Sequence, residues 1–342
     1  MPDVTIYTLA KELNMTPSMV SRAFSPSARI SEDKRKIILA AAKKYNFSPN
    51  RLASRLSMKP VRIGVLINSK FDANSEKMIA GIKASHEELK DYKIQYDVTL
   101  LKAAEATEKD FRKALNRYKT YDGIILTGMS SSAYTPWINE LCSVNPNVVQ
   151  VQADNREAGS LFVSKHNEET ASTLAAEFLY HVLKRSARKN VLLFTGDMES
   201  YLHANAQKSF AESCDSLGLS LLASVDMKDS EDYLHSILPA IFDRYKEQID
   251  GIYITSGISS ALCRYLEQHG LDIPLVAFDT YEDVKAYMQK GVISAAISQN
   301  VAKQMKIAFE MLVKHVITGE TPPATVYTNV QLVLKSNMHQ FD

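Results

Sequence analysis

From Val61 onward, short apolar runs alternate with helical stretches, and this alternation constrains the fold more than any other feature of the sequence. Such runs are typical of strands buried on both faces, as in a parallel sheet covered by helices. We predict strands over residues 62–67, 94–100, 123–127, 148–152, 191–195, 219–225, 251–255, 275–278, 293–297 and 330–336. So many strands, separated by helices, predict two sheets.

Two segments in this region look like one structural unit used twice. Asp122-Gly123-Ile124-Ile125-Leu126-Thr127-Gly128 and Asp250-Gly251-Ile252-Tyr253-Ile254-Thr255-Ser256-Gly257 begin 128 residues apart. Each places an Asp-Gly pair directly before a short apolar run, the arrangement expected where a strand begins. The duplication predicts two similar lobes.

The first sixty residues differ from the rest in charge. They contain eleven Lys and Arg against four Asp and Glu, a formal charge of +7, and the remaining residues carry −6. A basic segment joined to a mildly acidic body favours a phosphate-facing head. A solvated basic face with no partner is the alternative interpretation.

Three short helices are predicted in this basic segment. Thr5, Thr16 and Ser31 are the expected N-caps, and Pro17 occupies the first helical position, where its missing N–H costs nothing. The apolar positions expected to form the core are Ile6, Leu9, Ala10, Leu13, Val20, Ala23, Phe24, Ile37, Ile38, Ala41, Ala42 and Tyr45. A short turn between the first two helices predicts a helix-turn-helix, whose second helix enters the DNA major groove. A generic three-helix bundle is the alternative.

Arg22 on the second helix supports the DNA interpretation, because arginine can bind guanine O6 and N7 together. Three segments then resemble the lactose-repressor/galactose-repressor (LacI/GalR) family: Val4-Thr5-Ile6-Tyr7, Val20-Ser21-Arg22 and Ser48-Pro49-Asn50-Arg51-Leu52-Ala53. The resemblance runs from Val4 to Leu56 without a gap. It implies a bacterial transcription factor, a repressor, that binds double-stranded operator DNA as a homodimer.

The resemblance also implies that residues 48–60 form a hinge helix that orders on the operator and inserts Leu56 into the minor groove. Packing of Leu52 and Leu56 against the rest of the protein is the alternative. The residues expected to contact DNA are Thr5, Tyr7, Thr16, Pro17, Ser18, Ser21, Arg22, Arg29, Asn50, Ala53 and Leu56. Pro17 and Ser18 replace the larger base-reading side chains of many relatives, so the operator sequence does not carry over.

Together these features predict an N-terminal all-α helix-turn-helix domain followed by an α/β two-lobed sensor resembling periplasmic sugar-binding proteins. The expected boundaries are residues 1–47 for the DNA-binding domain, 48–60 for the hinge and 61–342 for ligand binding and dimerisation. Within the sensor, we expect the first lobe to comprise about 61–160 plus 293–320, and the second about 161–292 plus 321–342.

Ligands of open α/β sheets bind beyond the carboxyl ends of the strands. Asp154, Asp279 and Gln299 each follow a predicted strand, and the resemblance implies that they hold sugar hydroxyls of a small-molecule effector. Ala206 stands where the family usually has an arginine, and Ser256-Gly257 replaces its usual Asn-Asp pair. His203, Asn205, Ser256 and Phe71 complete the predicted effector site, although a histidine or phenylalanine in such a place is more often structural.

Other classes of protein fit less well. The sequence contains no GxGxxG after a strand, no GxxxxGK[ST], no HExxH and no GxSxG, so we expect no enzyme and no cofactor. Its three cysteines, Cys142, Cys214 and Cys263, lack ligand spacing, so no metal site is expected. An acid/base pair of Asp154 and Asp279 is the strongest enzymatic alternative. A sugar-binding protein without a gene-regulatory role is a better one. With no export signal or membrane-spanning run, we expect a cytoplasmic protein.

Overall fold

The computed structural model describes residues 5–24, 30–45, 47, 59–102, 105–155 and 157–341. Four of the predicted DNA contacts, Arg29, Asn50, Ala53 and Leu56, fall outside these residues, as does most of the predicted hinge helix.

The N-terminal segment folds into three helices, α1 (Ile6–Glu12), α2 (Pro17–Ala23) and α3 (Glu32–Lys44). The Thr5 and Thr16 hydroxyls accept hydrogen bonds from the third backbone N–H that follows each, so α1 and α2 begin at the predicted caps. The buried core comprises Leu9, Ala10, Val20, Ala23, Ile38 and Ala42. The prediction of Ile37 as a core residue is wrong, because its neighbour Ile38 faces inward and Ile37 is 52% exposed.

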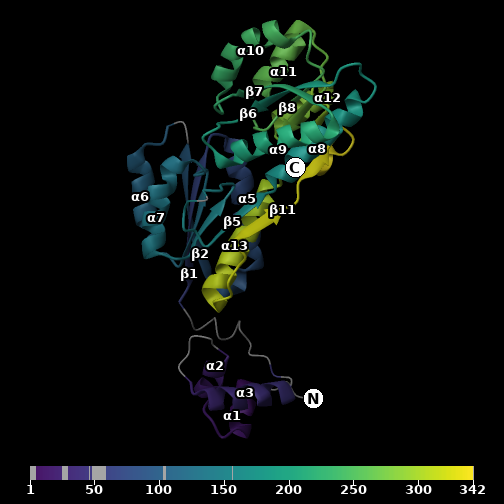
Figure 1. Ribbon diagram of the computed structural model, residues 1–342. Helices are drawn as coiled ribbons and strands as arrows, with labels where there is room; N and C mark the ends of the chain where they lie inside the picture. The colour runs from purple at the N-terminus through teal and green to yellow at the C-terminus, as the bar shows by residue number, and fades with distance from the viewer. Residues whose placement is uncertain are drawn as a thin grey trace.

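The first lobe is a six-stranded parallel sheet with helices on both faces (Figure 1). Its strands, in spatial order, are β2 (Ile94–Lys102), β1 (Val61–Ser69), β3 (Gly123–Thr127), β4 (Val148–Val151), β5 (Phe162–His166) and β11 (Thr325–Thr328). One face packs against α5 (Asp72–Glu88) and α13 (Val301–Thr318), and the other against α6 (Glu108–Tyr118) and α7 (Thr135–Val144). Short 3₁₀ turns, η1 (Lys90–Tyr92) and η2 (Ser132–Tyr134), complete the lobe.

The second lobe repeats this plan. Its strands, in spatial order, are β7 (Ser220–Asp226), β6 (Asn190–Thr195), β8 (Gly251–Ile254), β9 (Leu275–Phe278), β10 (Ala295–Ser298) and β12 (Gln331–Val333), of which β12 is antiparallel to its neighbour. One face packs against α8 (Glu168–Leu183) and α9 (Tyr201–Leu217). The other packs against α10 (Glu231–Tyr245), α11 (Ser260–His269) and α12 (Glu282–Lys290). A last 3₁₀ turn, η3 (Met338–Gln340), lies near the C-terminus.

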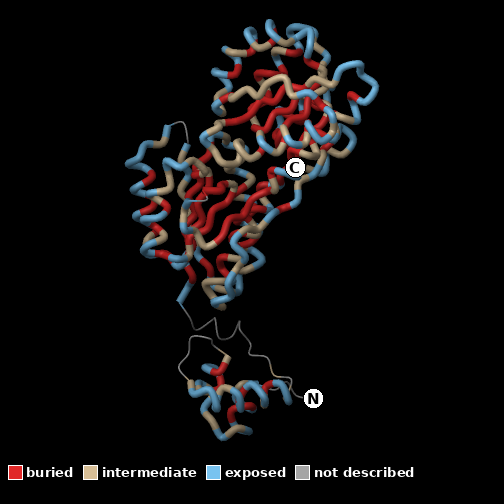
Figure 2. The backbone as a smooth tube through the Cα atoms, in the orientation of Figure 1, coloured by how far each residue is buried: buried red, intermediate tan, exposed pale blue. Residues whose placement is uncertain are grey.

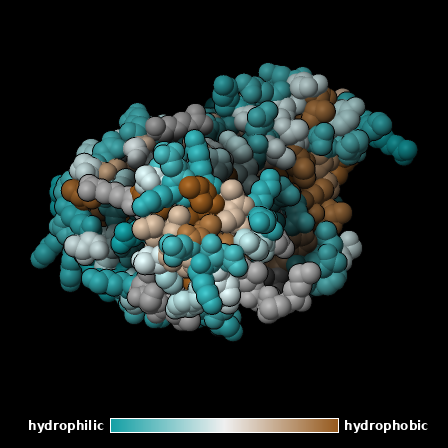
Figure 3. All heavy atoms as spheres, turned by 90° about the horizontal axis from the view of Figure 1, so that it is seen from below, coloured by the Kyte–Doolittle hydropathy of each residue, from teal (hydrophilic) through white to brown (hydrophobic). Residues whose placement is uncertain are grey.

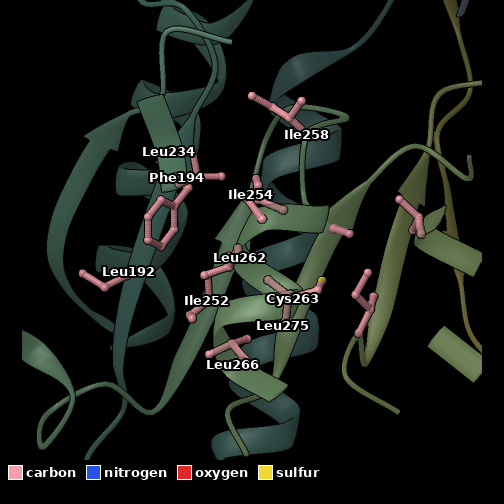
Figure 4. Close-up of a cluster of buried hydrophobic side chains, with 14 of the residues drawn as sticks. Leu192, Phe194, Leu234, Ile252, Ile254, Ile258, Leu262, Cys263, Leu266 and Leu275 are labelled. Atoms are coloured by element: carbon pink, nitrogen blue, oxygen red, sulfur yellow. The ribbon is translucent and has the colours of Figure 1, made fainter. Parts of the chain in front are cut away.

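Alternation along each strand fills the layers on both faces. On β6, Leu192 and Phe194 join the core beneath α10 and α11, whereas Val191 and Leu193 join the core beneath α8. Figure 4 shows the first of these cores, with Phe194, Leu234 and Ile254 among its labelled side chains. In Figure 2 the central strands of both lobes are buried along most of their length. Continuous burial explains why these strands appear as uninterrupted apolar runs in the sequence.

The predicted duplication is confirmed by the strand order and by matched contacts. Counted from the edge strands β2 and β7, β3 and β8 are each the third strand of their sheet. The Asp122 carboxylate accepts a hydrogen bond of 2.8 Å from the backbone N–H of Arg62, and Asp250 accepts one of 2.9 Å from Asn190. Each aspartate therefore fixes the start of its strand against the neighbouring strand in the same way.

The sequence did not predict two of the strands, and the sheet to which each belongs differs from the division into lobes that we expected. β5 and β11 carry polar residues and were missed, and both belong to the first sheet. β10, expected in the first lobe, pairs with β9 of the second, and β12 also belongs there. The chain therefore passes between the lobes three times, at residues 166–168, 298–301 and 328–331.

The surface drawn in Figure 3 is mainly hydrophilic, with hydrophobic atoms gathered in limited patches. Among the described residues, none of the helices has the length and apolar character needed to cross a bilayer.

Candidate functional site

A cavity of about 140 Å³ lies between the two lobes, beside the segments where the chain crosses from one lobe to the other. The first lobe contributes Phe71, Asn74, Gln152 and His166. The second lobe, with the segments that cross into it, contributes the rest of the wall. The residues lining it are Phe71, Asn74, Gln152, His166, Glu168, Ala171, Leu202, His203, Ala206, Asp229, Tyr253, Thr255, Ser256, Gly257, Phe278, Asp279, Tyr281 and Gln299. The cavity thus lies beyond the carboxyl ends of strands of both sheets.

Asp279 follows β9 directly and lies at the centre of a polar network. Its Oδ2 accepts a hydrogen bond of 2.8 Å from Gln299 Nε2, and the Tyr281 hydroxyl donates to the same oxygen at 3.1 Å. That hydroxyl also lies 3.3 Å from Asn74 Oδ1 on the opposite lobe. Burial raises the pKa of the Asp279 carboxyl, although the Gln299 amide and nearby Lys77 act in the opposite direction. The network joins both lobes at a carboxyl group held away from water.

Asp229, in the turn after β7, forms a second polar cluster. Its Oδ2 lies 3.4 Å from His203 Nε2, and its Oδ1 accepts a hydrogen bond of 2.7 Å from the Ser256 hydroxyl. His203 Nδ1 lies 3.2 Å from the Thr255 hydroxyl. Burial alone would raise the pKa of Asp229, but the contacts with His203 and Ser256 outweigh it and hold this pKa below its ordinary value. Asp229 is therefore an ionised carboxylate in the cavity wall.

A buried ion cluster supports the third side of the cavity. Lys165 Nζ lies 2.6 Å from Asp154 Oδ2 and 3.1 Å from Glu168 Oε2. Desolvation opposes the charge on Lys165, but the two carboxylates raise its pKa. Burial, with the nearby Lys165 ammonium, lowers the pKa of His166 to about 3, so this histidine is neutral at physiological pH.

Asp154, which we expected to face the cleft, is not among the residues that line the cavity, and its carboxylate contacts Lys165. Phe71, His203, Ser256, Asp279 and Gln299 line the cavity as expected. Asn205 does not, since its neighbour Ala206 turns toward the cavity instead. Of the two aspartates in the enzymatic alternative, Asp279 lines the cavity and Asp154 does not.

Sequence reasoning missed the remaining polar residues of the wall. These are Asn74, Gln152, His166, Glu168, Asp229, Tyr253, Thr255 and Tyr281. Asp229 follows a predicted strand as Asp279 does, so the same rule would have found it. His166 and Glu168 flank the end of β5, which the sequence did not reveal.

Three residues of the wall have strained backbones. Gln152, Asp229 and Asp279 have φ angles of 49°, 46° and 65°, a region of backbone conformation that residues other than glycine seldom adopt. Such strain persists where surrounding contacts fix the residue, and it gathers at ligand sites. All three residues directly follow or lie close to the end of a strand, where the ligand of an open sheet is expected.

The helices of the N-terminal unit present most of the described DNA-contact candidates to solvent. Ser18, Ser21 and Arg22 are all exposed on α2, and Tyr7 of α1 is 72% exposed. Thr5 and Thr16 are exposed caps, and Pro17, which begins α2, is half-buried. The exposed set contains one guanidinium and several small hydroxyls, side chains that can reach base edges and phosphates.

Comparison with known proteins identifies the family of the two-lobed domain. The profile of the periplasmic binding protein domain matches residues 63–321. The chain belongs to this family. Among the described residues, no three His, Cys, Asp or Glu side chains are grouped in a way that could hold a metal ion.

A curated relative is the HTH-type transcriptional regulator MalR of Streptococcus pneumoniae, 25% identical over 308 residues and covering 81% of this chain and 84% of MalR. GanP, a glucose-galactose binding protein from Geobacillus stearothermophilus, has a TM-score of 0.73 at 18% identity and covers 82% of this chain and 99% of its own. A putative LacI transcriptional regulator from Bacteroides fragilis has a TM-score of 0.71 at 15% identity and covers 83% and 100%. These three similar proteins are named as transcriptional regulators or as a sugar-binding protein.

Proposed function

We propose that this chain is a DNA-binding transcriptional regulator, a repressor, whose affinity for its operator depends on a small carbohydrate-like ligand in the interlobe cavity. One observation carries the proposal. A basic three-helix unit that exposes Ser18, Ser21 and Arg22 on one helix belongs to the same chain as a two-lobed domain whose cavity is lined by polar and aromatic side chains. The 25% identity to the regulator MalR supports it.

In this proposal α1 and α2 are a helix-turn-helix, and α2 is the recognition helix. Arg22 reads a guanine, Ser18 and Ser21 reach neighbouring bases, and Thr5, Tyr7, Thr16 and Pro17 contact or position the backbone. Arg29, Asn50, Ala53 and Leu56, outside the described residues, remain proposed contacts on the strength of the sequence alone. Two copies form a homodimer in the cytoplasm and place their recognition helices about 34–36 Å apart on a pseudo-palindromic site.

The cavity supplies the regulatory half of the proposal. Asp279 joins Gln299 of one crossing segment to Tyr281, which reaches Asn74 on the other lobe, so a ligand that enters here contacts both lobes. A ligand that binds one arrangement of the lobes better than another shifts the equilibrium between them. A coupling of about 1–3 kcal/mol between cavity and operator would be enough for regulation.

A sugar-binding protein without a regulatory role is the second candidate. The likeness to GanP favours it, because the two-lobed domain alone would serve that purpose. Such a protein would have no use for the basic three-helix unit. Binding to DNA therefore separates the two candidates.

The deciding experiment is selection of binding sites by the purified full-length chain from random duplex DNA. We expect enrichment of a pseudo-palindrome. Arg22→Ala should then cost about 1–3 kcal/mol and relax one base position in each half-site. Lys36→Ala is the matched control, because Lys36 is an exposed cation on α3 and its loss should leave base preference unchanged. No enrichment by the native chain, or base discrimination that Arg22→Ala leaves intact, would refute the proposal.

A further inference from the structure

We propose that the natural ligand of the cavity is a hydroxylated molecule carrying a protonated amino group, such as an amino sugar, and that sugar phosphates and sugar acids are excluded. This inference rests on the proposed role of the cavity as the ligand site. It does not depend on the proposed role of the N-terminal helices.

The charge of the cavity wall carries the first step. Three carboxylates line it, those of Glu168, Asp229 and Asp279, and none of its described lining residues is a lysine or an arginine. Ala206 also lines the wall, and its methyl side chain carries no positive charge. A ligand in this cavity therefore meets negative charge and hydrogen-bond acceptors.

Lysines just outside the wall do not reverse this balance. Lys165 contacts two carboxylates, those of Asp154 and Glu168, so it neutralises only one of the two charges. Lys70 and Lys77 donate to the backbone carbonyls of Lys228 and Thr280, and they point to these oxygens across the lobe boundary. Three lysines face four carboxyl groups in and around the cavity, so the acidic side chains outnumber the lysines. Burial raises the pKa of Glu168 and Asp279, and a ligand ammonium beside them would favour their charged forms.

Unpaired polar atoms carry the second step, independently of the charge count. Glu168 Oε1 and His166 Nδ1 have no hydrogen-bond partner, and each residue is only 6% exposed. Both residues line the cavity, two positions apart at the end of β5 and the start of α8. Leaving such atoms unpaired in a buried place is costly, so a ligand group is expected to pair with them. An ammonium offers three donors and no acceptor, which suits a free carboxylate oxygen.

An anionic ligand lacks comparable partners. Phosphate sites are built from Lys, Arg or the free N–H groups of a helix N-terminus. The helices α5, α8 and α9 begin at the cavity. The first turn of α5 contains Asp72, and that of α8 contains Glu168 and Glu169. His203 in the first turn of α9 contacts the Asp229 carboxylate. A phosphate placed there would be repelled by these carboxylates.

The volume of the cavity limits the size of the ligand. At about 140 Å³ it is smaller than the roughly 300–1,000 Å³ typical of sites for drug-sized ligands. A single ring with several hydroxyls is the size expected. Asp279, Gln299 and Asn74 can then pair with hydroxyls, while Glu168 and Asp229 meet the amino group.

Matched ligand sets test the proposal. D-glucosamine, D-glucose and D-glucose 6-phosphate form one set, and the corresponding galactose and mannose compounds form two more. We would measure their affinity for the full-length chain at pH 7 by thermal shift and calorimetry, since a ligand that binds the folded state raises its melting temperature. We expect at least one amino sugar to bind roughly tenfold or more tightly than its neutral partner, and no phosphate to bind.

Charge-removing variants locate the effect. Glu168→Gln and Asp229→Asn keep the shape of the side chain, and at least one should reduce the preference for the amino sugar over its neutral partner roughly tenfold. Glu169→Gln is the matched control, because Glu169 is the exposed neighbour of Glu168 and does not line the cavity.

Two results would overturn the inference: a neutral or phosphorylated member binding most tightly in its set, or no amino sugar binding at all. Neither result involves DNA. Operator selection by the same preparation therefore reports separately on the proposed regulatory function.

Discussion

The Lys165 ammonium lies between two carboxylates, and its removal should destabilise the protein. Its side chain is 4% exposed, and those of Asp154 and Glu168 are 13% and 7% exposed. Lys165→Met would leave two neighbouring buried carboxylates without a counter-charge, and breaking a buried pair in this way costs about 3–5 kcal/mol. Urea unfolding of the variant would measure this loss directly.

A surface pair provides the control for this prediction. Lys306 lies 2.5 Å from Glu88, but the two side chains are 33% and 59% exposed. Water already solvates such a pair, so Lys306→Met should have a much smaller effect. Similar losses for both variants would show that the cluster around Lys165 contributes no more than an ordinary surface contact.

Asp279 should reveal a conflict between stability and function. Because burial raises the pKa of this carboxyl in the folded state, the fold loses stability as the pH rises from the ordinary value of 3.8 through the raised pKa. Asp279→Asn removes this penalty, so its melting temperature at pH 7 should exceed that of the native chain. This advantage should shrink as the pH falls through the same range.

Under the proposed function, the same variant should no longer respond to ligand, while its binding to operator without ligand stays normal. Thermal shift and operator titration with and without ligand measure both effects. A variant that is less stable at pH 7 would contradict the stability argument. A normal ligand response would remove Asp279 from the site.

At the scale of elements, the first lobe depends on the close packing of α5 against α13. A Cβ atom added at Gly81 of α5 would lie 2.2 Å from the backbone carbonyl oxygen of Ala302, a contact that backbone atoms cannot avoid without moving the helices apart. We expect Gly81→Ala to cost about 1–3 kcal/mol, although alanine favours helix formation. Lys83→Ala, at an exposed position on the same helix, should leave the melting temperature nearly unchanged.

Sequence patterns predicted the elements whose burial is continuous and missed those whose burial is mixed. β3 and β9 have the predicted bounds because every residue in them is buried and apolar or small. β5 is also fully buried, but it contains three polar residues, Ser164, Lys165 and His166. The Ser164 hydroxyl donates a hydrogen bond to the backbone carbonyl of Gln304 on α13, and the Lys165 ammonium contacts the Asp154 carboxylate after β4. No local pattern reports such partners, so the strand was missed.

The same reason limited the prediction of the site. The rule that ligands lie beyond strand ends led to Asp279 and Gln299, which line the cavity. It failed for Asp154, because the lysine that binds this aspartate lies on the unpredicted strand β5. The contact joins the loop after β4 to the neighbouring strand β5 and is not visible in either segment alone.

At the scale of the whole molecule, the lobes are joined by three crossings and by contacts near the mouth of the cleft. Ser130 of the first lobe and Ser200 of the second have hydroxyl oxygens 2.7 Å apart, and Ser131 forms an isolated antiparallel bridge with Ser200. Tyr201 also donates a hydrogen bond of 3.1 Å to Glu157 across the cleft. Lys70, Lys77 and Phe71 of the first lobe also contact the second lobe. Most of these interlobe contacts are polar, so the lobes can separate largely at the cost of hydrogen bonds that water replaces.

This arrangement allows the lobes to be locked. In a Ser130→Cys/Ser200→Cys variant, the two sulfur atoms should lie close enough to form a disulfide under oxidising conditions. If regulation requires the lobes to move, the oxidised variant should have one fixed operator affinity whether or not ligand is present, and reduction should restore the response. Operator titration in both redox states measures this. The single variant Ser130→Cys controls for oxidation at Cys142, which is only half-buried. An oxidised double variant with a normal response would show that ligand acts on DNA binding without movement at this edge of the cleft.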